Sequence, residues 1–534
     1  MTVYQPKNPQ VIFGGSSSSE QPSGTVDAPA AATYTGAAAY NPTVLQPPPV
    51  PSNPTVPTQF PVQLWSGGMA NLSMPLPGTF YGFSIEMSIS NHVLGKNSTF
   101  ISVPFLNLMA NIQERVGGVH VRIGGNTQES AEFVESLPNN SIIAKDYAAV
   151  TGTTNTPPLQ YTAELLYMMS NISSLANVHW YLGIPFFNTT PFDLSIMHEA
   201  QPILGDRLLG LQAGNEPDLY NAHGHRPEGY NQWNYFGEIG DLINQVGNDT
   251  EVTQRNNLFI VPSISLQWNP QDVWDTNIGQ AYSADLFALS VEHYPTDNCA
   301  AQFNTGQPIR DPQATFPQFL DHTSALSNVG TFLSGTAYAQ SVGKPFLMFE
   351  TNTASCGGFA GISDSYGAAL WALDWGLTMA ASNFSGALLH VGGANAFYNP
   401  FTPPPTNQST FRQWTVGPVY YSALVMAEIL GPSNASQVVD LGMNSGNIYT
   451  PGYVVYENGN PTKVVLFNFV TDPSGNTDYT ASISIGGGQT GQPNASPSSV
   501  KVKYLAADSV SAKYNFTWAG QVSLVSLMHY EHDN

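Results

Sequence analysis

Short apolar runs recur through the middle of the chain, and most of them are continuous rather than alternating with polar residues. Such runs are typical of parallel strands that are covered on both faces. Segments between them carry apolar residues at spacings of three and four, which predicts helices at 103–112, 161–169, 230–246 and 366–381. The eight runs that we interpret as strands are Phe80–Met87, Val119–Ile123, Val178–Phe187, Leu208–Ala213, Leu258–Leu266, Phe287–Tyr294, Pro345–Phe349 and Gly386–Val391.

Eight strand-and-helix units over roughly 350 residues predict an α/β fold, a (β/α)8 TIM barrel with enlarged loops. The alternative is a doubly wound open sheet, but no glycine-rich phosphate loop follows the first strand. We expect the barrel to span residues 79–431, with a closing helix at 417–430 that ends at Gly431 and Pro432.

After residue 431 the spacing of apolar residues changes to two, which is the period of a strand. Residues 453–467, with Asn458 and Gly459 near the turn, predict a β-hairpin. Further strands are expected at 479–485, 500–505 and 522–530. Together they predict a small β-sandwich at residues 432–534, appended to the barrel.

Residues 1–60 are rich in Pro, Ala, Ser, Gly and Thr and contain few large apolar side chains to bury. Runs such as Ser16–Ser19 and Gln46–Pro51 predict a flexible or extended polyproline-like arm.

The chain is strongly acidic, with 15 Lys and Arg residues against 37 Asp and Glu residues and a formal charge of −22. This charge repels polyphosphates and heavily sulfated chains, so nucleic acid is not an expected partner. With 534 residues and 42% apolar content, the chain can form a large globular core.

Charged residues make up only 10% of the chain, a balance that we associate with secreted proteins in mildly acidic surroundings. No apolar segment typical of a secretory signal follows Met1, so an extracellular location is inferred from composition alone. No run of 18 apolar residues predicts a membrane span. Eleven glycosylation sequons also favour an extracellular glycoprotein: Asn71, Asn97, Asn139, Asn171, Asn188, Asn248, Asn383, Asn407, Asn434, Asn494 and Asn515.

Cys299 and Cys356 are the two cysteines. In an oxidising compartment such a pair is expected to form one disulfide, and the alternative is two buried unpaired thiols. Both cysteines follow the ends of predicted strands, six and seven, which makes the bond feasible. No zinc-type cluster is present, and we expect neither a metal nor an organic cofactor.

Two glutamates stand at the ends of predicted strands four and seven. Glu216 lies in Asn215-Glu216-Pro217 after the fourth run, and Glu350 ends the seventh. Burying a charged side chain in such a place costs free energy unless the side chain is solvated, ion-paired or takes part in the protein's function. Each glutamate alone could be a solvated loop carboxylate or part of a structural ion pair.

The functional face of a (β/α)8 barrel is built from the carboxyl ends of its strands, so the two carboxyl groups can face each other across one pocket. Paired carboxyls indicate glycosidase chemistry, with retention at separations of about 5–5.5 Å and inversion at roughly 6.5–9.5 Å. The Asn215 amide could bind the sugar 2-hydroxyl, where hydrogen bonding tightens in the transition state.

The Asn-Glu-Pro sequence after strand four and the glutamate after strand seven resemble clan A retaining glycosidases. Within that clan, four further motifs resemble glycoside hydrolase family 79, the β-glucuronidase and heparanase group, and the segment 84–91 looks most like its fungal members. The resemblance covers roughly residues 60–534. The motifs are Phe83–Glu86, Val121–Thr127, His293–Pro295 and Glu350–Gly358.

The resemblance implies that Glu216 is the general acid/base and Glu350 the nucleophile. It also implies that Tyr294, after strand six, donates a hydrogen bond to Glu350 and holds it ionised; from the residues alone, Tyr294 could equally be an aromatic plug at the barrel mouth. Residues 61–78 are implied to join the C-terminal sandwich.

Substrate contacts are implied as well. Glu86 and Asn126, at the ends of strands one and two, are expected to bind sugar hydroxyls. The substrate carboxylate is expected to meet the backbone N–H groups of Gly357 and Gly358 and the hydroxyl of Tyr398, after strand eight. Two adjacent glycines can also be just a flexible turn.

The expected function is therefore that of a retaining exo-β-glucuronidase acting on glycans that end in glucuronic acid, with or without a 4-O-methyl group. Three alternatives remain open: a clan A glycosidase for neutral sugars, a heparanase-like endo-glucuronidase, and a non-catalytic carbohydrate-binding barrel. Heparanase-like cleavage calls for basic clusters, which this chain lacks. The sequence does not indicate an oligomeric state.

Overall fold

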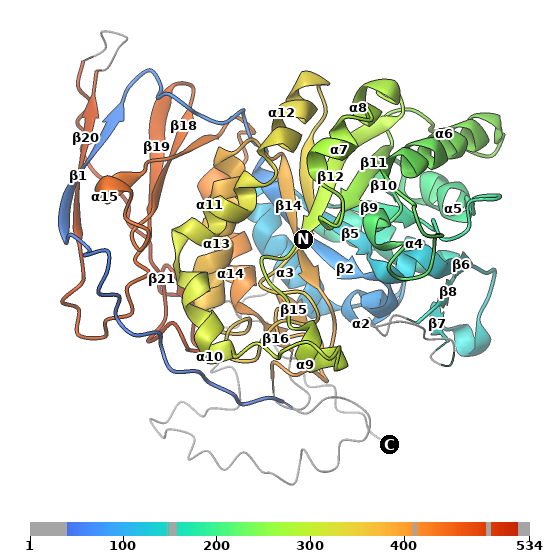
Figure 1. Cartoon of the computed structure of the whole chain (residues 1–534), viewed down its shortest axis with the longest axis horizontal. Helices are drawn as coiled ribbons and strands as arrows, with labels where there is room; N and C mark the ends of the chain where they lie inside the picture. Colours follow the sequence, from blue (N-terminus) through green and yellow to red (C-terminus); the bar gives the residue numbers. More distant parts are fainter. Residues whose placement is uncertain (1–39, 147, 149–156, 410–413, 488–492, 522–534) are drawn as a thin grey trace.

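The computed structural model describes residues 40–146, 148, 157–409, 414–487 and 493–521. Its centre is a closed barrel of eight parallel strands, one for each predicted run, which confirms the (β/α)8 fold (Figure 1). Several of these strands are buried at every residue, because helices cover the outside and side chains fill the interior. The barrel strands are β2 Tyr81–Glu86, β5 Val119–Gly124, β9 Val178–Ile184, β10 Leu208–Ala213, β11 Phe259–Ile264, β12 Leu286–His293, β13 Phe346–Thr351 and β14 Gly386–Val391.

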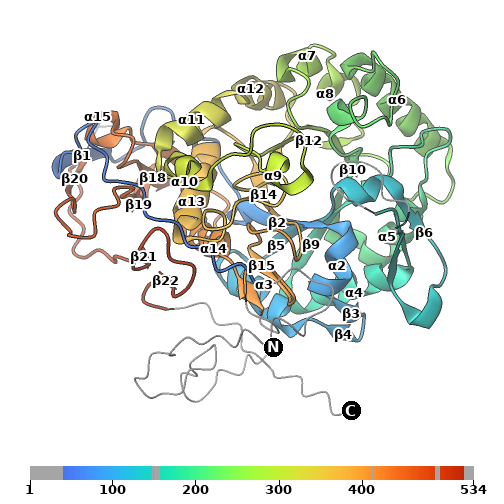
Figure 2. The same cartoon turned by 60° about the horizontal axis from the view of Figure 1, so that its bottom comes forward.

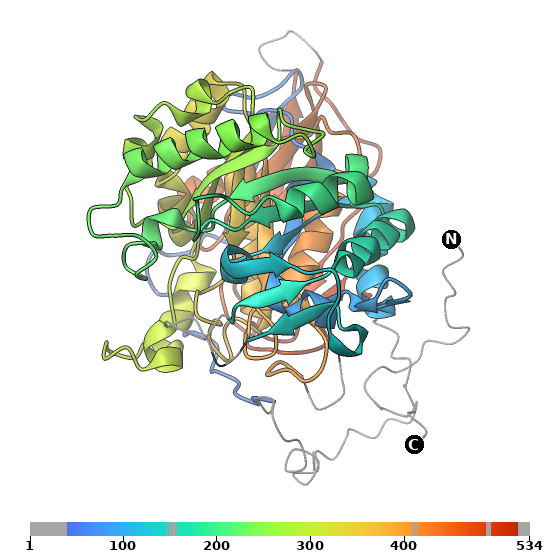
Figure 3. The same cartoon turned by 90° about the vertical axis from the view of Figure 1, so that its right-hand side faces the viewer.

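Helices lie around the outside of the barrel, and the four predicted from apolar spacing are all present (Figure 3). The first, α3 Val103–Val116, begins where the Ser102 hydroxyl accepts a hydrogen bond from the Phe105 N–H (3.3 Å) and ends at Gly117, with a φ of 87°. The longer helices that follow are α4 Ala163–Ala176, α5 Ser195–Leu204, α6 Gln232–Asn248, α11 His322–Gly330, α12 Leu333–Ser341, α13 Tyr366–Ala381 and α14 Pro418–Leu430.

Short elements fill the connections between these units. Small helices are α2 Ser90–Val93, α7 Pro270–Trp274, α8 Ile278–Ala281, α9 Cys299–Phe303 and α10 Pro312–Thr315. Small strands are β3 Gly95–Asn97, β4 Phe100–Ile101, β6 Ala131–Phe133, β7 Ile143–Lys145, β8 Leu159–Tyr161, β15 Phe401–Thr402 and β16 Thr415–Val416. No helix in the described ranges is long and apolar enough to cross a membrane.

The C-terminal part of the chain forms a β-rich domain beside the barrel (Figure 1). The predicted hairpin is present, and it is extended by β17 into a three-stranded sheet. A second, two-stranded sheet shares an apolar core with the first. The elements are β17 Gln437–Asp440, α15 Met443–Gly446, β18 Gly452–Glu457, β19 Asn460–Leu466, β20 Thr480–Gly486, β21 Leu505–Ala506 and β22 Thr517–Trp518.

One predicted strand is wrong. The alternation of apolar residues and lysines at 500–505 predicts a half-buried strand, but only β21 forms at its end. Val500, Val502 and Tyr504 are 77%, 66% and 71% exposed, and residues 500–504 pair with no other strand in the described part of the chain. The strand predicted at 522–530 lies outside the described residues.

The N-terminal arm is described from residue 40 onward, and its first 39 residues lie outside the described ranges. Residues 40–58 run as extended chain from the barrel along the edge of the molecule to the β-rich domain (Figure 1, Figure 2). There β1 Gln59–Trp65 pairs in parallel with β20. Phe60, Val62 and Leu64 point into the shared apolar core, while the alternate residues are exposed.

A buried histidine joins the barrel to the β-rich domain. His322 Nδ1 lies 3.0 Å from Asp374 of α13, and its Nε2 lies 3.0 Å from Asp440 of β17. The Tyr453 hydroxyl donates a second hydrogen bond to Asp374 (2.6 Å). Burial alone would lower the pKa of His322, but the hydrogen bonds and charges of the two aspartates outweigh it and raise this pKa to about 10.

Replacing His322 should therefore destabilise the protein in a pH-dependent way. Because its pKa is raised above the unfolded value near 6.5, its contribution is fully present below about pH 6.5 and is lost between pH 6.5 and 10. We expect His322→Gln to lower the free energy of unfolding by about 3–5 kcal/mol at pH 6 and by clearly less at pH 9.5. Urea denaturation at both pH values measures this difference.

The half-buried surface residue His198, paired with Asp249, offers a matched control. His198→Gln should cost less than about 1 kcal/mol at pH 6. A His322→Gln effect of equal size at pH 6 and 9.5 would show that the histidine acts without its charge.

Candidate active site

The carboxyl ends of the barrel strands bring the predicted site residues to one face of the barrel. Glu86 is the last residue of β2, and Glu350 is the second-last residue of β13. The other members lie in the loops that follow their strands: Asn126 after β5, Asn215 and Glu216 after β10, Tyr294 after β12, Gly357 and Gly358 after β13, and Tyr398 after β14. Glu216 is thus three residues beyond its strand rather than at its end.

A fully buried arginine in β5 connects most of these elements. Arg122 Nη1 donates hydrogen bonds to Glu350 Oε2 (2.7 Å) and to Ser84 Oγ (3.0 Å). Its Nη2 donates to Asn215 Oδ1 and lies 3.3 Å from Glu292 Oε1. One guanidinium therefore fixes side chains from strands one, six and seven and from the loop after strand four.

The surroundings of Glu350 keep its carboxyl group ionised. Tyr294 donates a hydrogen bond to Glu350 Oε1 (2.8 Å), and His390 Nδ1 lies 3.4 Å from Oε2. Burial opposes ionisation, but His390, Arg122 and Tyr294 together outweigh it and hold the pKa of Glu350 below its ordinary value. Its side chain is 11% exposed, so it remains accessible to solvent.

The surroundings of Glu216 instead favour the protonated form of its carboxyl group. Burial, with the negative charges of Glu350 and Asp218, raises its pKa well above the ordinary value, so it holds a proton where Glu350 does not. Its backbone has a φ of 47°, a left-handed conformation that is rare for a glutamate and clusters at functional sites. Among the described residues its carboxyl group has no hydrogen-bond partner, so the backbone sets its position.

Two buried carboxyl groups hold that backbone on either side of Glu216. Glu129 accepts a hydrogen bond from the Asn215 N–H and another from the loop after β9. Asp218 accepts hydrogen bonds from the backbone N–H groups of Ser265, Gln267 and Trp268, in the loop after β11. The strained turn that presents Glu216 is thereby tied to its neighbouring loops.

Glu86 and Asn126 line the adjacent part of the site. Glu86 accepts hydrogen bonds from the N–H (3.1 Å) and the hydroxyl of Thr127. Burial raises the pKa of Glu86 to about 7. Asn126 Oδ1 accepts a hydrogen bond from the Asn215 side chain (3.3 Å), which links Asn126 to the centre of the site.

The loop after β13 is braced by the predicted disulfide, which the structure confirms: Cys299 and Cys356 are bonded, with Cα atoms 5.0 Å apart. The carbonyl of Gly357 accepts a hydrogen bond from the Phe397 N–H (2.7 Å), and that of Gly358 accepts one from the side chain of Asn298 (2.8 Å). Within the described ranges, the N–H groups of the two glycines have no acceptor. Such paired amides can bind an anion.

Tyr398 packs directly against this loop. A Cβ atom on Gly358 would lie 3.0 Å from its ring, and one on Gly392 would lie 2.7 Å from its hydroxyl, so both positions need glycine. Asn352, two residues after Glu350, donates hydrogen bonds to the carbonyls of Tyr398 and His390 (3.0 Å each). The loops after β13 and β14 therefore form one packed unit.

Several residues of the site were not singled out in the sequence. Arg122 and Glu292 lie inside apolar strand runs, and a single charged residue in such a run could have indicated them as members of the site. Glu129, Asp218 and Asn352 act through backbone groups of distant loops, and no sequence pattern indicates such contacts.

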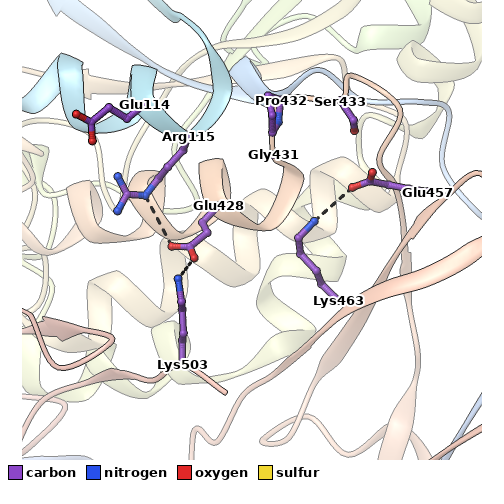
Figure 4. Close-up of a pocket in the computed structure, with 9 residues that line it drawn as sticks. All are labelled: Glu114, Arg115, Glu428, Gly431, Pro432, Ser433, Glu457, Lys463 and Lys503. Atoms are coloured by element: carbon purple, nitrogen blue, oxygen red, sulfur yellow. Dashed lines mark hydrogen bonds and ion pairs between the residues drawn. The ribbon is translucent and has the colours of Figure 1, made fainter. Parts of the chain in front are cut away.

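The described residues contain no group of three or more His, Cys, Asp and Glu side chains placed to hold a metal ion. A shallow hollow of about 680 Å³ lies elsewhere, between the ends of α3 and α14 and the β-rich domain (Figure 4). Gly78, which precedes β2, packs against Val116 and Gly431 there, so this hollow is at the amino ends of the strands. Its cations are paired with Glu428 and Glu457 and do not face the carboxylate site.

Comparison with known proteins agrees with this architecture. A family model for the glycosyl hydrolase family 79 C-terminal beta domain matches residues 452–524. The β-glucuronidase of Aspergillus niger is 25% identical over 425 residues, covering 77% of this chain and 75% of that protein. A β-glucuronidase of Neurospora crassa is 24% identical over 431 residues, covering 74% of this chain and 73% of that protein.

Solved structures share the fold. A 4-O-α-L-rhamnosyl-β-D-glucuronidase from Fusarium oxysporum superposes with a TM-score of 0.65 at 19% identity, covering 87% of this chain and 92% of that one. A family 51 arabinofuranosidase from Xanthomonas axonopodis pv. citri gives a TM-score of 0.52 at 12% identity, covering 81% of this chain and 87% of that one. The comparisons thus show a family 79 C-terminal beta domain at residues 452–524, similarity to fungal β-glucuronidases over about three quarters of the chain, and a fold shared with solved glycosidases.

Proposed function

We propose that the protein is a retaining exo-β-glucuronidase that removes terminal β-linked glucuronic acid, with or without a 4-O-methyl group, from glycans. The observation that carries this proposal is the placement of Glu216 and Glu350 at one barrel face, where Arg122 and Tyr294 donate hydrogen bonds to Glu350 and the surroundings shift the two pKa values in opposite directions. Paired carboxyl groups with separated pKa values are what acid-assisted glycoside cleavage needs. The curated relatives named β-glucuronidase support the choice of sugar.

In this mechanism the ionised Glu350 attacks the anomeric carbon while Glu216 protonates the departing oxygen. Glu216, now ionised, then takes a proton from the water that hydrolyses the glycosyl-enzyme, and both residues return to their starting states. Arg122 and Tyr294 stabilise the carboxylate form of Glu350 between turnovers.

The sugar carboxylate is proposed to bind the amides of Gly357 and Gly358 and the hydroxyl of Tyr398. These groups lie in one packed unit, and the two amides are without acceptors among the described residues. Glu86, Asn126 and Asn215 are proposed to bind sugar hydroxyls.

The disulfide and the eleven sequons support an extracellular location, which we propose for this protein. We also propose that residues 79–431 are the catalytic barrel and that residues 61–78 belong with 432–534. The parallel pairing of β1 with β20 supports this division.

Substrate class can be tested with Tyr398→Phe, which keeps the ring and deletes only the hydroxyl. A hydrogen bond to a charged group is worth about 1.5–3 kcal/mol, so kcat/KM for an aryl β-glucuronide should fall by roughly one to two powers of ten. Weak activity on the matching β-glucoside should stay nearly unchanged.

The matched control is Tyr514→Phe, since Tyr514 is 51% exposed in the β-rich domain. This variant should behave as wild type on both substrates. A wild-type enzyme that prefers the glucoside, or an equal loss on both substrates in Tyr398→Phe, would instead favour a neutral-sugar glycosidase.

The roles of the two glutamates are separable by leaving group. Glu350→Ala should abolish turnover, whereas Glu216→Ala should retain activity on substrates whose leaving group needs no protonation, and azide should rescue it as a β-glycosyl azide. NMR of the first-formed sugar from wild-type enzyme should show the β-anomer. Equal losses on activated and natural substrates, without azide product, would contradict the assignment.

The pH dependence of substrate binding should depend on Glu86. Since its pKa is about 7, Glu86 is neutral in acid and becomes negatively charged as the pH rises above 7, where it repels a glucuronate. We expect KM for the glucuronide to rise roughly fivefold between pH 6 and 8, for about 1 kcal/mol of repulsion. In Glu86→Gln, and with the neutral glucoside, this rise should disappear; an identical rise in the variant would exclude Glu86 as its source.

A further inference from the structure

A buried lysine of the β-rich domain meets the N-terminal arm and the barrel at one point. The Lys513 side chain is 1% exposed, and its Nζ lies 2.7 Å from Asp364 Oδ2. The same ammonium donates to the carbonyls of Asn41 (2.8 Å) and Thr43 (3.3 Å) and lies over the ring of Tyr40. A buried ammonium group is tolerated only when it is ion-paired and hydrogen-bonded, so the burial of Lys513 depends on these contacts.

Asp364 ends the loop that follows β13. Its other oxygen accepts a hydrogen bond from the Gly361 N–H (2.7 Å). The preceding residue, Ser363, accepts one from the Phe359 N–H (2.9 Å) and lies beneath Gly358, where an added Cβ would come within 2.5 Å of its hydroxyl. The buried lysine is therefore connected, through this loop, to the glycine pair.

The arm also touches both active-site loops directly. Leu45 occupies the space beside Gly361, where a Cβ would lie 2.8 Å from its Cγ. The Asn41 N–H donates a hydrogen bond to the carbonyl of Asn407 (3.0 Å). Asn407 in turn donates hydrogen bonds to the carbonyls of residues 394 and 395. Those residues belong to the loop that carries Tyr398.

The arm and the segment that carries Lys513 are each held to the barrel by further hydrogen bonds. Gln46 exchanges two hydrogen bonds of 2.9 Å with Gln313 of α10, which anchors the arm on the barrel. Next to Lys513, the carbonyls of Ala512 and Val510 accept hydrogen bonds from the N–H groups of Tyr366 (2.8 Å) and Gly367 (2.7 Å) at the start of α13. Figure 2 shows the arm, in blue, crossing from the barrel toward the β-rich domain.

We propose that arm residues 40–46 and Lys513 position the loops that bind the substrate carboxylate, and so determine the preference for a carboxylated sugar. The inference rests on the proposed glucuronidase function. Lys513 and the arm contact no reacting atom; they act through Asp364, Gly361 and Asn407. The β-rich domain and the arm thereby contribute to specificity at a site built on the barrel.

The test is Lys513→Met, which keeps the length of the side chain and removes its charge. Asp364, 3% exposed, then loses its counter-ion, and the glycine loop should shift. We expect kcat/KM for an aryl β-glucuronide to fall by roughly 10- to 100-fold, mainly through KM, since a displacement of about 1 Å can have such an effect. Activity on the matching β-glucoside should change less than about threefold, because its sugar has no carboxylate to bind.

The matched control is Lys503→Met, an exposed lysine of the same domain that pairs with Glu428 in the hollow of Figure 4. It should leave both activities unchanged. Thermal unfolding accompanies each assay, so that a folding defect is recognised.

Two further variants keep the proposal open to disproof if Lys513→Met does not fold. In Lys513→Met/Asp364→Leu both buried charges are replaced by apolar groups, which is commonly neutral for stability, and the glucuronide KM should move back toward wild type. Leu45→Ala removes an arm contact without stranding a charge, and it should raise the glucuronide KM in the same direction by a smaller factor.

The possible outcomes separate this inference from the function on which it rests. Wild-type enzyme without a preference for glucuronide overturns the proposed function and the inference with it. Wild-type preference with an unchanged glucuronide-to-glucoside ratio in the folded variants, or with equal losses on both substrates, overturns the inference alone.

Discussion

The site depends on the balance of charge around one buried guanidinium. Arg122 is paired with Glu350 and Glu292, while Glu86 and Glu216 lie in the same low-dielectric region and form no ion pair with any described residue. Because the interior cannot hold so many negative charges, burial raises the pKa of Glu86, of Glu216 and even of Glu292, whereas His390, Arg122 and Tyr294 together lower that of Glu350. Chemically identical side chains thereby acquire opposite pKa shifts, which is what the proposed acid and nucleophile require.

The barrel was predictable because its strands are buried on both faces and therefore read as continuous apolar runs, each bounded by polar residues. The alternating pattern was misleading at residues 500–504, where Val and Lys alternate but the described part of the chain provides no neighbouring strand to complete a sheet. A two-residue period shows which side chains a strand could bury on one face. Whether that strand forms is decided by tertiary contacts. The path of the arm onto Asn407 and Gln313 had no sequence signal at all.

For the site, the residue types at strand ends located Glu216, Glu350 and Tyr294 on one face, and the disulfide followed from there being two cysteines. Their individual roles remain predictions. The groups that hold them in place could not be foreseen, because Glu129 and Asp218 contact backbone atoms of loops far away in sequence. Backbone geometry such as the left-handed turn at Glu216 leaves no compositional trace in a non-glycine residue.

The parallel pairing of β1 with β20 has a consequence for how the chain is made. Gln59–Trp65 emerges from the ribosome early, yet its partner, Thr480–Gly486, is synthesised more than 400 residues later. The barrel strands lie between these two segments in the sequence, so the barrel can assemble meanwhile. The apolar side of β1 must therefore stay uncovered until residues 480–486 have been made. A fragment that begins at residue 432 would lack this strand and present an uncovered core, which makes the β-rich domain unsuitable for expression as a C-terminal piece.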